Sequence, residues 1–368
     1  MRREYDWQYG VKKMLQVKEI LNKAVAGERL SVEEGVALLN SSDLIQLGAA
    51  ANTIRKRLHP KNRTTFIIDR NINYTNICTC KCKFCAFWRE PSDPDAYILP
   101  QEELYQKIEE TIAVGGTEIL VQGGLHPELG LDYYVDLLKS IKERYNIHIH
   151  SFSPPEIWHI ARKEGLPLLR VIEALKNAGL DSIPGGGAEI LDNRVRRIIS
   201  PDKVTWEEWM EVMTIAHCLD MKTTATMMFG HVETPEERIL HMVRVRDTQD
   251  KTGGFTAFIP WSFQPKNTKL GGETTSGIDY LKTLAVARLM LDNVKNIQAS
   301  WVTQGAKMAQ VSLNFGANDF GSTMLEENVV RAAGVTYRVA LQEILRCIRE
   351  AGFRPAQRTT DYRIIKEM

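Results

Sequence analysis

The sequence lacks an excess of charge of either sign and has no long apolar segment. Its 47 Lys and Arg residues are nearly balanced by 46 Asp and Glu residues. A broad nucleic-acid interface needs a basic excess, so no nucleic-acid partner is expected. No run of about 18 apolar residues occurs, which is roughly the minimum for a membrane-spanning helix. The first residues, MRREYDWQYG, also lack the apolar stretch of a secretory signal. Chemistry on a small molecule is the function class that remains.

Cysteine is scarce as well, with six residues in a chain of 368. That number is too small for a disulfide scaffold in a protein of this length. Four of the six nevertheless lie close together, at Cys78, Cys80, Cys82 and Cys85. Cysteines this near in sequence are typical of metal ligation rather than of mutual disulfides. We therefore expect a protein of the reducing cytoplasm.

The rest of the chain predicts an α/β fold. Residues from about 10 to 60 have helical patterns, and Ser31 with Glu34 forms a capping-box signature. Beyond this segment, short apolar runs alternate with helical patterns. The eight candidate strands are Thr65–Asp69, Glu118–Gln122, Ile147–Phe152, Leu180–Ile183, Thr223–Met228, Thr256–Ile259, Ile297–Trp301 and Val311–Asn314. Eight such alternations favour a (β/α)8 TIM barrel over a doubly wound sheet.

Three segments follow from this pattern. We predict an N-terminal helical extension over residues 1–62, the barrel over 63–330, and a C-terminal helix and tail packing on the barrel over 331–368. After nearly every candidate strand comes a segment rich in Gly, Asn, His, Pro or acidic residues. The loops that follow the strands of a barrel converge on one mouth, where binding and catalysis occur. The predicted site therefore lies at that mouth.

The cysteine segment predicts the chemistry. Cys78, Cys82 and Cys85 have the spacing C-x3-C-x2-C. Three thiolates can ligate three irons of a [4Fe–4S] cluster and leave the fourth iron without a protein ligand. Radical S-adenosylmethionine (SAM) chemistry requires this open iron, because it chelates the amino and carboxylate groups of SAM. We expect Cys80 to stay unligated. The alternative is a structural zinc site with Cys80 as fourth ligand, although C-x-C-x-C-x2-C is not a familiar zinc-finger spacing.

Two features near the cysteines fit SAM binding. Phe84, directly before the third ligand, is expected to pack beside the adenine of SAM. Gln122, Gly123 and Gly124 end the second candidate strand. Glycines there allow the backbone to approach the amino group of SAM with little steric obstruction.

The cysteine loop with Phe84 resembles the radical SAM superfamily signature. Segments 73–76 and 122–127 resemble a subgroup that holds two menaquinone-pathway enzymes and the deazaflavin-chromophore synthases. Segments 151–156, 181–189, 258–268 and 316–324 resemble the cyclic dehypoxanthinyl futalosine synthases of that subgroup. An aminofutalosine synthase or a deazaflavin-chromophore synthase remains the alternative. A non-catalytic zinc protein is the alternative from another class.

The resemblance implies a reaction and its partners. A 5′-deoxyadenosyl radical takes the C4′ hydrogen from the ribose of dehypoxanthine futalosine. The sugar radical then adds to the substrate's own benzoate ring, and loss of one electron and one proton gives cyclic dehypoxanthinyl futalosine. SAM is the cosubstrate, and a flavodoxin or ferredoxin is the expected low-potential electron donor.

The resemblance also implies site residues. Ser151, Ser153, Glu189 and Thr226 are further expected SAM contacts, although Thr226 departs from the pattern of related barrels. The candidates for substrate contact or catalysis are Tyr74, His126, Glu156, Asp181, His231, Gln264, Asn267 and Asn318. The sequence does not identify which residue accepts the proton.

Overall fold

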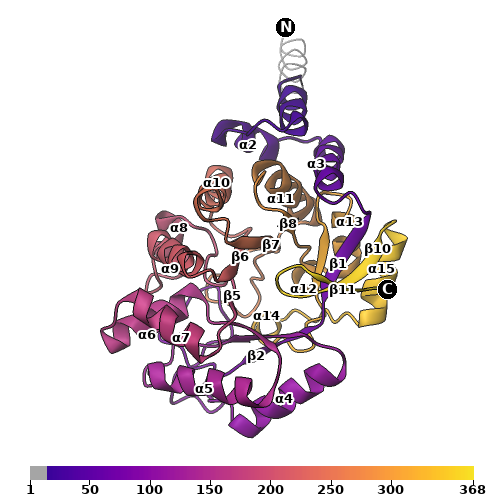
Figure 1. Cartoon of the computed structure of the whole chain (residues 1–368). Helices are drawn as coiled ribbons and strands as arrows, with labels where there is room; N and C mark the ends of the chain where they lie inside the picture. The colour runs from indigo at the N-terminus through magenta and orange to yellow at the C-terminus, as the bar shows by residue number, and fades with distance from the viewer. Residues whose placement is uncertain (1–14) are drawn as a thin grey trace.

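A curled parallel sheet forms the centre of the molecule in the computed structural model, which describes residues 15–368 (Figure 1). Seven strands pair in chain order. They are β2 (Asp69–Asn73), β3 (Glu118–Gln122), β4 (His148–Ser151), β5 (Ser182–Ile183), β6 (Lys222–Phe229), β7 (Phe255–Ser262) and β8 (Asn296–Ile297). Because all seven are parallel, their carboxyl ends meet at one rim.

Helices connect these strands around the outside of the sheet (Figure 1). They are α4 (Gln101–Ala113), α5 (Leu131–Arg144), α6 (Pro154–Glu164), α7 (Leu168–Ala178), α8 (Asn193–Ile199), α9 (Trp206–Cys218), α10 (Pro235–Thr252) and α11 (Gly277–Met290). Local sequence sets their ends. Thr234 caps α10 in a capping box with Glu237, and Gly253 ends it with a φ of 62° that few other residues adopt.

A second sheet of four strands lies beside the first, in the order β11-β10-β1-β9. Its members are β1 (Arg63–Ile67), β9 (Asp319–Ser322), β10 (Arg354–Arg358) and β11 (Ile364–Glu367). β1 continues into β2 through Ile68. On the other side, the Asn318 amide donates to the Ile297 carbonyl at 3.0 Å. The curled sheet is thus a partial barrel with β1 and β9 adjoining its two edges.

The predicted strand over Val311–Asn314 is wrong. Val311 belongs to α13 (Ala306–Ser312), in which Ala309 and Ser312 are buried three residues apart, as on one helix face. The strand of this region is β9, whose sequence Asp-Phe-Gly-Ser lacks the apolar run of a typical buried strand. Its Asp319 is buried because it pairs with the buried Arg358. The predicted strand Ile297–Trp301 is too long, since Trp301 begins α12 (Trp301–Gln304).

The described N-terminal part packs on helices α10 and α11, and the C-terminal part joins the second sheet. The N-terminal part forms a helix over residues 15–26, α2 (Val32–Leu39) and α3 (Leu44–Leu58). Ser31 and Glu34 form the predicted capping box at α2, and α3 packs along α11. The C-terminal part contains α14 (Val329–Ala332) and α15 (Leu341–Glu350) and then β10 and β11, which the prediction of a helix and tail did not include.

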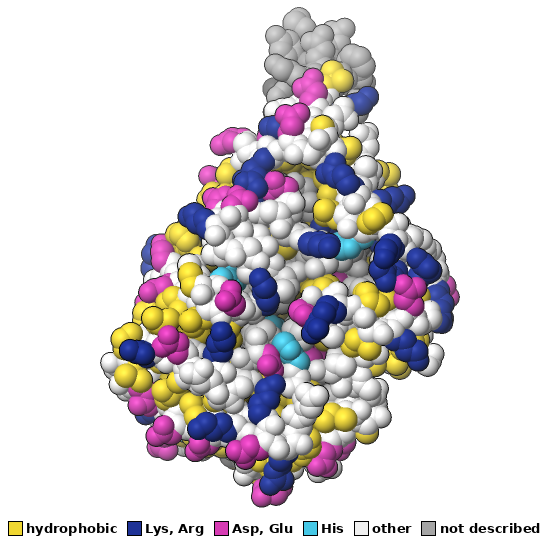
Figure 2. Space-filling model, in the orientation of Figure 1, with side chains coloured by type: hydrophobic (Ala, Val, Ile, Leu, Met, Phe, Trp, Pro, Cys, Tyr) yellow, Lys and Arg dark blue, Asp and Glu magenta, His cyan; other side chains and the backbone are white. Residues whose placement is uncertain are grey.

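Charged side chains of both signs are interspersed over the visible face of the molecule, as the balanced composition implies (Figure 2). Over residues 15–368, the helices are all too short or too polar to cross a membrane.

Candidate functional site

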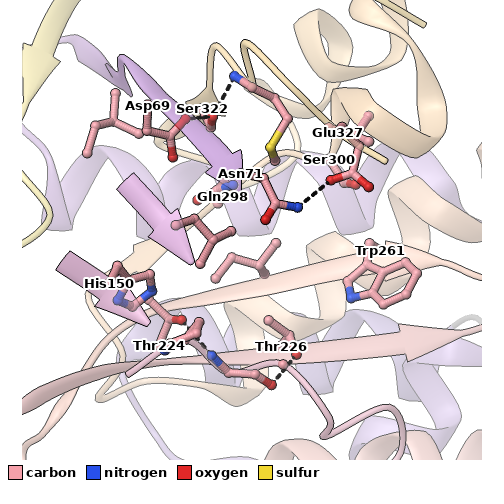
Figure 3. A pocket seen from close by; sticks show the side chains of 18 of the residues that line it. Asp69, Asn71, His150, Thr224, Thr226, Trp261, Gln298, Ser300, Ser322 and Glu327 are labelled. Carbon is pink, nitrogen blue, oxygen red and sulfur yellow. Dashed lines mark hydrogen bonds between the residues drawn. The ribbon is translucent and has the colours of Figure 1, made fainter. Parts of the chain in front are cut away.

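A cavity of about 290 Å³ lies inside the curled sheet (Figure 3). Its walls come from β2, β3, β4, β6 and β7 and from the segments that follow β5 and β8. Polar side chains recur at every second strand position, as at Asp69 and Asn71 and at Thr224 and Thr226. Alternate residues of a strand face the same side, so these pairs all point inward. The lining residues labelled in Figure 3 are Asp69, Asn71, His150, Thr224, Thr226, Trp261, Gln298, Ser300, Ser322 and Glu327.

One end of the cavity is formed by the amino ends of the strands and by β10. Arg358 of β10 is buried and donates from Nε and Nη2 to Asp319 at 2.5 and 3.1 Å. Thr360 donates its hydroxyl to the carboxylate of Glu118. Burial, together with the nearby Glu118, raises the pKa of Asp69 to about 8. The end of the chain thereby supplies part of the cavity floor.

The cysteine loop follows β2 at the carboxyl end of the sheet. The Cys78 amide donates to the Arg89 carbonyl at 3.1 Å, and the Lys83 amide donates to the Ile199 carbonyl at 2.8 Å. A Cβ at Gly124 would overlap the carbonyl oxygen of Ile77. Only glycine therefore lets the end of β3 approach the loop this closely, which gives Gly124 a packing role in addition to the expected one.

The thiols of the loop differ in environment. Hydrogen bonding from Cys80 lowers the pKa of Cys78 to about 6 and also lowers that of Cys82. Burial raises the pKa of Cys85 to about 11. Cys80 is buried, and its thiol donates to the Asp202 carbonyl at 3.4 Å.

The donor set fits an iron–sulfur cubane. Within residues 15–368, no three His, Cys, Asp or Glu side chains converge on the position of a single metal ion. A cubane instead takes each thiolate to a different iron, so its ligands surround a core rather than a point. Cys78, Cys82 and Cys85 are free thiols on one loop and supply the three thiolates that such a core takes.

A lysine that the sequence analysis missed lies beside the loop. Lys203 Nζ is 3.0 Å from Glu189 and 5.3 Å from the centre of the Phe84 ring. Burial disfavours its charged form, but Glu189 and the nearby cysteines raise the pKa of Lys203. Arg196 approaches the same carboxylate at 3.4 Å. No motif marks Lys203, because its position depends on the turn that follows α8.

The expected SAM contacts divide into two groups. Gln122, Glu189 and Thr226 line the cavity. Ser151 and Ser153 instead support the backbone around it. Ser151 donates to the Val121 carbonyl at 2.6 Å, and Ser153 caps α6.

Tyr74 and Glu156 form a buried network outside the cavity lining. The Tyr74 hydroxyl and the Gly123 amide donate to the same Glu156 oxygen at 2.7 and 3.0 Å. Ser153 donates to the other oxygen. Burial raises the pKa of Glu156, the third residue of α6. This network ties the ends of β2 and β3 to α6.

Other substrate candidates make local contacts. His126 accepts from the Glu128 amide at 3.1 Å, and His231 contacts the Met228 carbonyl at 3.0 Å. Burial lowers the pKa of both histidines. Gln264 donates to the Ser262 carbonyl at 3.2 Å, and the exposed Asn267 donates to the Ala332 carbonyl at 3.0 Å. Of the eight substrate candidates, none is among the residues that line the cavity.

Two candidates lie at the opposite end of the sheet from the mouth. Asp181 precedes β5, is exposed, and pairs with Lys142 at 2.6 Å. Asn318 precedes β9 and accepts from Arg288 at 2.7 Å. The predicted positions of both residues are wrong for the same reason. Asp181 was placed within the predicted strand Leu180–Ile183 and Asn318 after the predicted strand Val311–Asn314, whereas each directly precedes an observed strand.

Comparison with known proteins identifies the family. The model of the radical SAM superfamily matches residues 72–244, and the model of the CofH/MqnC C-terminal region matches residues 252–368. A cyclic dehypoxanthine futalosine synthase of Halalkalibacterium halodurans is 52% identical, over 96% of both chains. One of Streptomyces coelicolor is 44% identical, over 94% of this chain and 88% of that protein.

A second kind of relative is also similar. A 5-amino-6-(D-ribitylamino)uracil–L-tyrosine 4-hydroxyphenyl transferase of Methanopyrus kandleri is 44% identical, over 96% of this chain and 98% of that protein. Among solved structures, methylornithine synthase has a TM-score of 0.72 at 20% identity, covering 92% of this chain and 97% of its own. The hydrogenase maturase HydG of Carboxydothermus hydrogenoformans has a TM-score of 0.74 at 18% identity, and the match covers 98% of this chain and 84% of HydG. Sequence and fold agree, and the chain belongs to the cyclic dehypoxanthine futalosine synthase family of the radical SAM superfamily.

Proposed function

We propose that this protein converts dehypoxanthine futalosine to its cyclic product in menaquinone biosynthesis, with a [4Fe–4S] cluster and SAM. The observation that carries the proposal is the 52% identity, over nearly the whole of both chains, to a cyclic dehypoxanthine futalosine synthase. The spacing of Cys78, Cys82 and Cys85 supports it independently. A cytoplasmic location and a flavodoxin or ferredoxin as electron donor belong to the same proposal.

Cys78, Cys82 and Cys85 would hold the cluster. When bound, the cluster supplies the electron that cleaves the sulfonium C–S bond of SAM. The positive charge of Lys203, close to Phe84, offsets the negative charge that thiolates bring into a buried place. Gln122, Glu189 and Thr226 line the adjoining part of the cavity and are the SAM contacts we propose.

The cavity suits the second substrate. Carbon radicals are quenched by nearby hydrogen donors, so the reacting sugar and ring must be enclosed and held in place. Ile259 and Trp261 give the cavity apolar wall area, and Thr224 of β6 and Gln298, which directly follows β8, add polar groups. We propose that the ribose and the benzoate ring bind here, where the sheet keeps them together for carbon–carbon bond formation.

The second candidate function is that of the 4-hydroxyphenyl transferases, favoured by the 44% identity to the Methanopyrus kandleri protein. Anaerobic, cluster-loaded protein is incubated with SAM, a reductant and dehypoxanthine futalosine, and in parallel with tyrosine and 5-amino-6-(D-ribitylamino)uracil. Our proposal expects 5′-deoxyadenosine and a product two hydrogens lighter than dehypoxanthine futalosine in the first reaction only. Product in the second reaction alone would assign the transferase function instead.

A further inference from the structure

Asn71 and Glu327 form a hydrogen-bonded pair on the cavity wall (Figure 3). Asn71 Nδ2 donates to Glu327 Oε2 at 2.9 Å, and the Val330 amide donates to Glu327 Oε1 at 2.7 Å. Asn71 is 4% exposed and lies in the middle of β2. Glu327 lies in the segment between β9 and α14. The pair was not among the residues singled out from the sequence.

The pair has an unused acceptor, the side-chain oxygen of Asn71. A carboxylate only accepts hydrogen bonds, so the Asn71 amide must turn its nitrogen toward Glu327. Its oxygen, Oδ1, is then buried without a partner among the described residues. A buried acceptor of this kind costs about 1–3 kcal/mol if nothing satisfies it. The pair therefore favours a ligand that donates a hydrogen bond to this oxygen.

The charge of Glu327 narrows the ligand further. Among residues 15–368, no Lys, Arg or His side chain forms an ion pair with it, so no cation here would offset the negative charge of a ligand. Glu189 on the same cavity differs, because Lys203 and Arg196 both contact it. An uncompensated carboxylate repels a second carboxylate. The benzoate end of a substrate is excluded here, whereas neutral hydroxyl groups are accepted.

We propose that Asn71 and Glu327 bind the ribose hydroxyls of dehypoxanthine futalosine and so fix which end of the substrate lies at β2. This inference rests on the proposed function. One hydroxyl donates to Asn71 Oδ1 and the other to the Glu327 carboxylate. The two residues are positioning residues, since their contact holds the sugar while its neighbouring C4′ reacts.

Equilibrium binding tests the inference without turnover. Isothermal titration calorimetry measures the Kd of dehypoxanthine futalosine for anaerobic, cluster-loaded protein with SAM and no reductant. A hydrogen bond to a charged group contributes about 1.5–3 kcal/mol, so Glu327→Gln is expected to raise this Kd by about 10- to 100-fold. Asn71→Leu is expected to raise it as well. Glu326→Gln is the matched control, because Glu326 pairs with Lys107 and Arg70 and is not part of the cavity lining.

Substrate analogues that lack the 2′- or the 3′-hydroxyl separate a specific contact from a general disturbance. One of these analogues should bind the wild-type protein more weakly than the substrate does. For that analogue, Glu327→Gln should raise the Kd by less than about threefold, since the hydroxyl that contacts Glu327 is already missing. The inference is overturned if Glu327→Gln binds dehypoxanthine futalosine as tightly as the wild type does. It is also overturned if the substitution raises the Kd of both analogues by the same factor as the Kd of the substrate. If Glu327→Gln does not fold, the wild type decides alone, and equal affinity for the substrate and both analogues overturns it. Wild-type protein that neither binds nor converts dehypoxanthine futalosine would instead contradict the proposed function.

Discussion

Four cysteine side chains lie within one loop, and their different environments predict different effects of substitution. Cys80 is buried and hydrogen-bonded to a carbonyl, which suits a structural thiol. We expect Cys78→Ala, Cys82→Ala and Cys85→Ala each to abolish SAM cleavage and Cys80→Ala to retain it. Iron and sulfide content and 5′-deoxyadenosine formation are the measurements. An inactive Cys80→Ala protein beside a normal Cys78→Ala protein would show that the proposed set of ligands is wrong.

Gly124 is the residue that brings the end of β3 against the cysteine loop. An added methyl group must displace the Ile77 backbone, so Gly124→Ala should lower the free energy of unfolding by about 1–3 kcal/mol. It should also reduce the iron bound after reconstitution. Gly165→Ala is the control, since Gly165 has a φ of 63° and nothing within 4 Å of its added Cβ. The control should lose some stability yet bind iron normally, and equal iron content in both variants would contradict the argument.

At the scale of residues, local spacing predicted the cysteine set but not the cavity lining. Thr224 and Gln298 were read as parts of strands with no inward role, and Asn71 was placed after the predicted strand Thr65–Asp69, although it lies in the middle of β2. Alternate polar residues within a strand were the available signal. Glu327 and Lys203 had no such signal, because only tertiary packing brings their segments to the cavity.

Among the elements, β10 depends most on a single contact. Arg358 pairs with Asp319 of β9, and their side chains are 6% and 0% exposed. Removing one partner of a buried ion pair costs about 3–5 kcal/mol, because the other charge stays buried. Arg358→Met should therefore lower the free energy of unfolding by about that amount in urea titrations. Arg170→Met removes an exposed pair with Glu173 and should cost less than about 1 kcal/mol. Similar losses in the two variants would contradict the assignment.

Helices were the more predictable elements. The capping residues of α2 and α10 mark their starts in the sequence. β9 and β10 escaped prediction, because Asp319 and Arg358 break the apolar pattern of a buried strand. Their charges are tolerated only because the two strands face each other across β1. That pairing joins distant parts of the chain and leaves no local signal.

At the scale of the whole molecule, buried neutral histidines predict how stability depends on pH. Burial lowers the pKa of His241 to about 3, whereas an unfolded histidine titrates near about 6.5. Between these values the unfolded chain binds more protons, so stability falls as the pH falls, by up to about 1.4 kcal/mol per pH unit. His241→Gln removes this contribution. The difference in unfolding free energy between wild type and variant should shrink by about 3 kcal/mol from pH 6.5 to 4.

The measurement is a urea titration of both proteins at each pH. Asp69, with its raised pKa, contributes a slope of opposite sign. Its contribution is common to both proteins and cancels in the difference. A difference that stays constant over this pH range would show that His241 is not a neutral, buried group.

The pairing of β10 with β1 has a consequence for biosynthesis. Arg63 lies opposite Arg354, so strands from opposite ends of the chain are neighbours in one sheet. A nascent polypeptide emerges from the ribosome with its amino end first, and segments made early wait for partners made late. The floor of the cavity can therefore assemble only after β10 has been translated, nearly 300 residues after β1.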